Sequence, residues 1–112
     1  MKLETVIKLL DAKVLSKKDC LETEVFAACG SDLMSDVLAF VKDQALLLTG
    51  LVNSQVVRTA EMMDMKAIVF VRGKLPGDDI LELADEADIA ILSTELPLYI
   101  SCGKLYSEGL YN

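Results

Sequence analysis

The chain has 112 residues, of which 53% are hydrophobic, and its 18 acidic and 11 basic side chains give a formal net charge of −7. This is a common size for a single domain, and the apolar content is enough for a buried core, which excludes a disordered chain. The acidic balance excludes nucleic acid as a partner and disfavours an anionic membrane, because both repel negative charge and the longest basic cluster is Lys17-Lys18.

The N-terminal segment predicts a helix. Its apolar side chains share one stripe at helical spacing: Leu3, Val6, Ile7 and Leu10. Charged residues interrupt the segment, so it lacks the continuous apolar stretch of a secretory signal, and no run approaches the roughly 18 residues that span a bilayer. We therefore expect a cytoplasmic protein with no membrane contact.

The three cysteines of the chain also indicate a cytoplasmic protein. They are an odd, scattered set without a CxxC pair: Cys20, Cys29 and Cys102. Such a set is typical of reduced thiols rather than a disulfide framework or a metal site. Cys29 adjoins a glycine at a predicted strand end, where an inert thiol is the simpler interpretation.

Two short strands and a helix follow in the first third of the chain. Residues 13–15 are compatible with one strand, and residues 24–29 predict another. The sequence GSDLMSDVLAF then joins a polar loop, residues 30–32, to apolar residues at helical spacing: Met34, Val37, Leu38 and Val41. This loop either begins the helix or holds a ligand.

From residue 45 onward the chain repeats one pattern. Apolar runs begin at Ala45, Ala67 and Ile89, and they lie 22 and 21 residues apart when measured from Leu46 to Ile68 and on to Ile89. Such runs suit strands that are buried on both faces of a parallel sheet. Helical spacing fills residues 53–64, 78–87 and 96–108, with Asn53 or Ser54 as a cap, Pro76-Gly77-Asp78 as an entry and Gly109 as a stop. The sequence predicts an α/β fold: one domain over residues 1–112, layered α/β/α around a mainly parallel central sheet.

Small polar sets follow the predicted strands, at the edge where open parallel sheets bind ligands. The candidate ligand-binding residues are Gly30, Ser31, Asp32, Thr49, Gly50, Asn53, Arg72, Gly73, Lys74, Ser93 and Thr94. Glycines let backbone N–H groups approach a ligand, and Arg72 with Lys74 suits an anion. This interpretation predicts a nucleotide or another small anion bound at the edge.

A structural interpretation competes with it. Ser31 or Asp32 suits a helix N-cap, Thr49-Gly50 and Ser93-Thr94 are common turn residues, and Arg72 with Lys74 suits a solvated loop. The spacing matches neither GxxxxGK[ST] nor GxGxxG, so neither phosphate-binding motif is present.

The sequence offers few of the residue types that catalysis requires. The chain contains no histidine, the usual base that activates serine or cysteine at neutral pH. A magnesium site on Asp32, Asp36 or Asp78-Asp79 is the remaining enzymatic alternative, although acidic residues near helix starts commonly complement the helix dipole. We expect no enzyme activity, no catalytic or metal-binding residue and no cofactor.

The sequence GSDLMSDVLAF, with LLLTG and AIVFVRG downstream, resembles the DRTGG domain family over almost the whole chain. Thr49-Gly50 looks like the family's threonine–glycine element, whereas residues 51–53 differ from the Gly-Asp-Arg of longer members. The resemblance implies a fold similar to the N-terminal domains of HPr kinase/phosphatase and of Mur ligases. It also implies a non-catalytic module for regulation, subunit association or ligand sensing.

Two hypotheses about function follow. The first is a regulatory and interaction module that forms a homodimer and modulates an unknown protein partner. The second is a sensor that binds a nucleotide or small anion at the carboxyl ends of the strands. The absence of histidine and the family resemblance favour the first, and the polar loops motivate the second.

Overall fold

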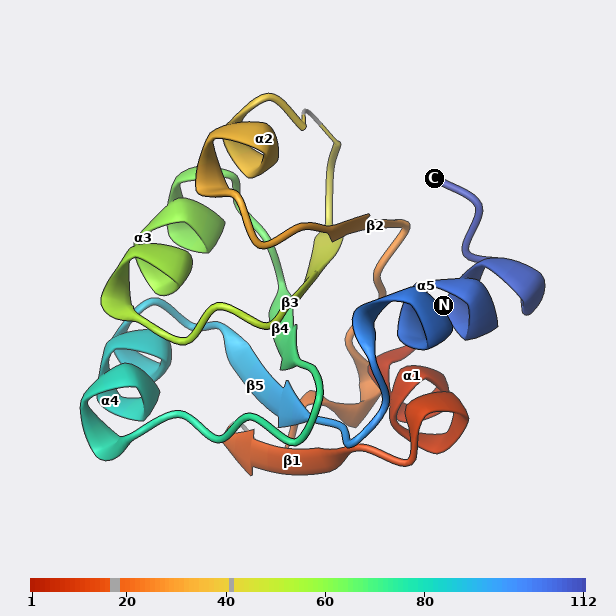
Figure 1. Cartoon of the computed structure of the whole chain (residues 1–112), viewed down its shortest axis with the longest axis horizontal. Helices are drawn as coiled ribbons and strands as arrows, with labels where there is room; N and C mark the ends of the chain where they lie inside the picture. The colour runs from red at the N-terminus through yellow and green to blue at the C-terminus, as the bar shows by residue number, and fades with distance from the viewer. Residues whose placement is uncertain (17–18, 41) are drawn as a thin grey trace.

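A computed structural model describes residues 1–16, 19–40 and 42–112, in which helices and strands alternate along most of the chain (Figure 1). The helices and strands are α1 (Leu3–Leu10), β1 (Lys13–Ser16), the 3₁₀ turn η1 (Cys20–Glu22), β2 (Ala27–Gly30), α2 (Met34–Leu38), β3 (Ala45–Thr49), α3 (Ser54–Met62), β4 (Ala67–Phe70), α4 (Asp78–Glu86), β5 (Ala90–Ser93) and α5 (Leu98–Ser107).

The five strands form one sheet in the order β1-β5-β4-β3-β2. The four strands β2 to β5 run parallel, and in register Leu47 of β3 faces Ile68 of β4, which faces Ile91 of β5. Every residue of β3, β4 and β5 is buried, which explains their uninterrupted apolar sequence. The predicted side-by-side, same-direction arrangement of the three late strands is confirmed.

The first strand is the exception to the parallel sheet. β1 pairs with β5 antiparallel, with Lys13 opposite Ser93. Only Asp11 and Ala12 separate β1 from α1, and Asp11 adopts a left-handed conformation with φ of 48°. This tight turn sends the chain back beside β5, so the sheet is mainly rather than wholly parallel.

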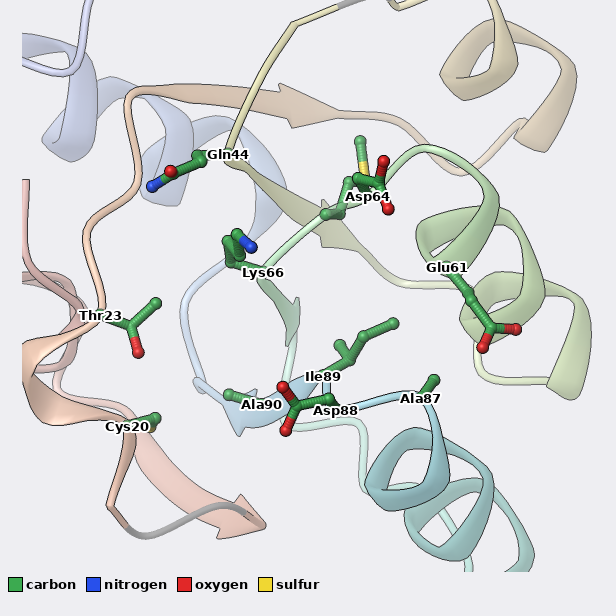
Figure 2. A pocket seen from close by; sticks show the side chains of 11 residues that line it. Cys20, Thr23, Gln44, Glu61, Asp64, Lys66, Ala87, Asp88, Ile89 and Ala90 are labelled. Carbon is green, nitrogen blue, oxygen red and sulfur yellow. The ribbon is translucent and has the colours of Figure 1, made fainter.

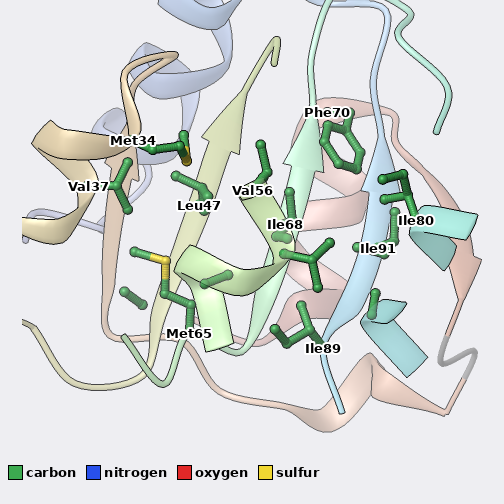
Figure 3. Packing of buried hydrophobic residues seen from close by; sticks show 14 of the residues in the cluster. Met34, Val37, Leu47, Val56, Met65, Ile68, Phe70, Ile80, Ile89 and Ile91 are labelled. Atoms are coloured by element: carbon green, nitrogen blue, oxygen red, sulfur yellow. The ribbon is translucent and has the colours of Figure 1, made fainter. Parts of the chain in front are cut away.

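Helices cover both faces of the sheet (Figure 1). On one face, α2, α3 and α4 bury a core in which Met34, Val56 and Ile80 meet Leu47 and Ile68 of the strands (Figure 3). On the other face, α1 and α5 pack over the alternate side chains of the same strands. The α/β/α layering predicted from the sequence is therefore confirmed.

The ends of several elements differ from prediction. The strand expected at residues 24–29 begins at Ala27, because the N–H of Val25 bonds to Met1 and that of Phe26 to Gln44. The last helix begins at Leu98 rather than Leu96, with Pro97 at its N-cap, and Gly109 follows its end with φ of 116°. Such shifts arise where contacts with other segments set the end of an element.

The helix expected after the loop at residues 30–32 is short. α2 spans Met34–Leu38, and its N-cap is Leu33, with no side-chain hydrogen bond to the helix start. The prediction that Ser31 or Asp32 caps this helix is wrong, since both side chains bond elsewhere. Val41, the last residue of the predicted helical pattern, and the basic pair Lys17-Lys18 lie outside the described residues.

Candidate functional site

All of the sequence-predicted site residues lie at or just beyond the carboxyl ends of the parallel strands. Because β2 to β5 run in one direction, the loops that follow them share one edge of the sheet. We call this the carboxyl edge. It consists of Gly30, Ser31, Asp32, Thr49, Gly50, Asn53, Arg72, Gly73, Lys74, Ser93 and Thr94.

One carboxylate connects two of these loops. Oδ1 of Asp32, beyond β2, accepts hydrogen bonds from the Gly50 N–H at 2.7 Å and from the Thr49 hydroxyl at 3.1 Å, both at the end of β3. The Ser31 hydroxyl accepts from the Leu33 N–H at 3.0 Å within its own loop. The donors that the sequence offered to a ligand here bond to the protein itself.

The later loops are organised in the same way. The Ser93 hydroxyl donates to the carbonyl of Lys74 at 2.9 Å, and the buried Thr94 hydroxyl donates to the carbonyl of Leu10 at 2.6 Å. Oδ1 of Asn53 accepts from the N–H of Val56 at 3.1 Å, so the predicted cap of α3 is confirmed. These side chains hold loops and helix ends in place.

The two cationic side chains of the carboxyl edge, Arg72 and Lys74, are exposed. Arg72 has a left-handed backbone with φ of 58°, and its guanidinium lies over Gly50, where a Cβ atom would be 2.6 Å from Nη2. A Cβ atom on Gly73 would be equally close to Oε2 of Glu95. Within the described part of the chain, neither Arg72 nor Lys74 forms an ion pair. These two cations are the groups at this edge that remain available to an anion.

The opposite edge of the sheet carries a polar pocket that the sequence reasoning missed. Its volume is about 550 Å³, and it lies at the amino ends of β3, β4 and β5. Figure 2 shows its charged and amide side chains, which come from the turns before those strands and, for Glu61, from the last turn of α3: Gln44, Glu61, Asp64, Lys66 and Asp88. The sequence feature that could have located this pocket is the polar residue directly before each apolar run: Gln44, Lys66 and Asp88. Among the described residues, no group of three or more His, Cys, Asp or Glu side chains is placed to hold a metal ion.

Two further pockets lie on either side of α5. One, of about 500 Å³, lies between α5 and the outer edge of β2, and Gly30 and Cys102 both line it. The other, of about 370 Å³, lies between α5 and Leu9 of α1. Gly30 is the one predicted site residue that lines any of these three pockets.

The two half-buried thiols near this region have a weakened acidity. Burial raises the pKa of Cys29 above its usual value, with a smaller contribution from Cys102 and Asp36, and burial alone raises the pKa of Cys102. A raised pKa keeps a thiol protonated at neutral pH, which lowers its reactivity as a nucleophile. The inert interpretation of Cys29 agrees with this direction.

The sheet topology defines the class of protein: a small layered α/β domain with four parallel strands and one antiparallel edge strand. The family model of the DRTGG domain matches residues 5–100, and the chain belongs to this family. The resemblance seen in the sequence is therefore confirmed. A comparison with curated protein sequences found no match.

The fold is similar to that of a solved structure. That structure is the regulatory region of the Clostridium perfringens pyrophosphatase, with its CBS and DRTGG domains, in complex with the activator diadenosine tetraphosphate. The sequences are 12% identical, and the TM-score is 0.76 over 93% of this chain. The chain spans 45% of the length of that neighbour. In the part of the chain that the structure describes, no helix has the length and apolar character needed to cross a membrane.

Proposed function

We propose that this protein is a non-catalytic regulatory module that forms a homodimer and modulates a partner protein. The observation that carries the proposal is that the polar side chains of the carboxyl edge form hydrogen bonds within the chain. Its hydroxyls and its central carboxylate, Asp32, bond within the chain, as a scaffold requires. Membership of the DRTGG family, which has a fold relative in a pyrophosphatase regulatory region, supports the same role.

Sedimentation velocity tests the homodimer. We expect a species with twice the chain mass of 12.2 kDa at tens of micromolar protein. A single species with the mass of one chain at that concentration would contradict self-association. Turnover of a metabolite by the purified protein at an ordinary enzymatic rate would contradict the non-catalytic role.

A second candidate function is a sensor for a nucleotide or another small anion. Arg72 and Lys74 favour it, because both are exposed and unpaired within the described residues at the edge where parallel sheets bind ligands. The fold relative was solved with a dinucleotide activator, which makes adenine nucleotides the first ligands to test.

Thermal unfolding with adenine and guanine nucleotides, with and without magnesium, tests the sensor. A ligand at about 100 times its dissociation constant stabilises the folded state by about 2.7 kcal/mol, which produces a clear rise in Tm. Combined Arg72→Ala and Lys74→Ala should abolish the rise, whereas Lys66→Ala at the opposite edge should preserve it. Loss of the rise in Lys66→Ala alone would move the ligand to the polar pocket, and no rise with any nucleotide would reject a nucleotide sensor.

A further inference from the structure

The helix α5 presents an apolar side that no part of the described chain covers. Its other side is buried through Ser101 and Leu105. The uncovered side carries Tyr99, which is 86% exposed, Ile100 and Tyr106. Tyr111, just beyond the helix, meets Tyr106 edge to face with ring centroids 5.1 Å apart. We call these residues, together with Gly103, the α5 face.

Gly103 lies in the middle of the α5 face. It is four residues after Tyr99 and three before Tyr106, so helical spacing places it between the two rings. Gly103 and Tyr99 line both pockets beside α5, which therefore meet at the glycine. Tyr99 and Tyr106 therefore lie on either side of Gly103 along the helix, next to the two pockets.

Nothing within the described chain requires a glycine at this position. A Cβ atom on Gly103 would have no atom within 4 Å. The other glycines are more constrained within the chain: a Cβ on Gly30 would lie 2.6 Å from Sγ of Cys102, and Gly73 and Gly109 have positive φ. A Cβ on Gly50 or Gly77 would meet the end of the Arg72 or Asp79 side chain at 2.6 or 2.9 Å. Glycine inside a helix costs about 0.5–1 kcal/mol relative to alanine. A surface that approaches α5 from outside the chain would account for that cost.

Charge indicates which surface approaches. Each chain carries a net charge of −7, so two copies repel unless they meet where charge is low. From residue 98 to residue 112 the charged side chains are Lys104 and Glu108, which sum to zero. A neutral, aromatic face on an acidic protein suits a second face of the same kind better than it suits a basic partner.

We propose that the α5 faces of two copies of this chain pack against each other across a two-fold axis at Gly103. This inference rests on the proposed homodimer and names its interface. Ile100 and Tyr106 lie three residues before and three after the glycine, so an antiparallel crossing sets Ile100 of each copy against Tyr106 of the other. The absence of a side chain at position 103 lets the helices approach closely, and the aromatic rings fill the pockets beside them.

Gly103→Gln tests the interface. Glutamine favours a helix, and its Cβ would have no atom of the described chain within 4 Å, so the single chain should be as stable as wild type or more stable in urea. In sedimentation velocity the variant should associate roughly thirtyfold more weakly, as is typical when a central contact is lost. Met62→Gln, which replaces a 72% exposed side chain on α3, is the matched control and should dimerise as wild type does.

Each outcome separates this interface from the homodimer itself. Weaker association of Gly103→Gln with a folded chain and a normal Met62→Gln supports the α5 face. Wild-type affinity in Gly103→Gln overturns the α5 face while the homodimer stands, and weakened Met62→Gln would then place the contact on α3. If Gly103→Gln fails to fold, Tyr99→Ser supplies the same comparison. A monomeric wild type overturns both proposals.

Discussion

The carboxylate of Asp32 accepts a hydrogen bond from the backbone N–H of Gly50 at 2.7 Å, across 18 positions of the sequence. The same oxygen accepts from the Thr49 hydroxyl, which in turn accepts from the N–H of Leu51. A polar loop that looked like a helix start or a ligand site therefore ties the end of β2 to the end of β3.

The first prediction concerns this tie. Asp32→Ala should lower the free energy of unfolding by about 1–3 kcal/mol, because the Gly50 N–H and the Thr49 hydroxyl lose a charged acceptor. Asp32→Asn should lose less, since the amide keeps an acceptor oxygen. Urea denaturation measures the difference. Asp36→Ala, one turn along α2, is the control with a smaller expected loss, and equal losses in the two alanine variants would contradict the tie.

The second prediction concerns Thr94, which lies after β5 and is buried. Thr94→Val keeps the shape of the side chain but removes the hydroxyl that donates to Leu10 and accepts from the N–H of Leu96. Two backbone groups lose their partner, so the free energy of unfolding should fall by about 1–3 kcal/mol. Thr5→Val on the exposed side of α1 should change it by less than about 0.5 kcal/mol. Equal effects in chemical denaturation would show that the buried bond contributes nothing.

The third prediction couples Gly30 to Cys102. A Cβ atom on Gly30 would lie 2.6 Å from Sγ of Cys102, so the thiol must move in Gly30→Ala. Overpacking of this kind costs about 1–3 kcal/mol. Cys102→Ala removes the opposing atom, so the double variant should recover most of the loss. A double-mutant cycle in urea measures this coupling, and strictly additive effects would refute the contact.

The fourth prediction is a pH dependence of stability. The folded-state pKa values of Cys29 and Cys102 lie above the ordinary 9.0, so in the window above 9 the unfolded chain loses these protons first. Stability from the protonated thiols is present below pH 9 and is lost as the pH rises through that window. The stability advantage of wild type over the double variant Cys29→Ala with Cys102→Ala should therefore shrink between about pH 8 and about pH 10 in urea denaturation. An advantage that stays constant or grows would contradict the raised pKa values.

The parallel core was predictable because strands that are buried on both faces need apolar residues at consecutive positions, and such runs are visible in the sequence. β3, β4 and β5 need apolar residues at every position, and the runs beginning at Ala45, Ala67 and Ile89 supply them. The cap at Asn53 was predictable for a similar reason, since its partner, the N–H of Val56, is three residues away. Local partners are visible in local sequence.

The carboxyl edge was predictable as a place but not as a set of contacts. Strand direction brings the loops together, and all of the predicted site residues lie there, although Glu95, whose carboxylate lies beside Gly73, was not among them. It could not tell that Asp32 bonds across to Gly50 rather than to its own helix, because that choice depends on the positions of two neighbouring strands. The pocket at the amino ends was missed for the same reason, since its lining comes from separate turns.

The amino-acid order alone determined the layered α/β class, the direction of the three late strands and the lack of histidine chemistry, because hydrophobic burial and side-chain type act position by position. Only the tertiary structure decided that β1 runs antiparallel, that Asp32 joins two loops and that Gly103 is centred on an uncovered helix face. Those features depend on which distant segments meet, and folding the whole chain sets that.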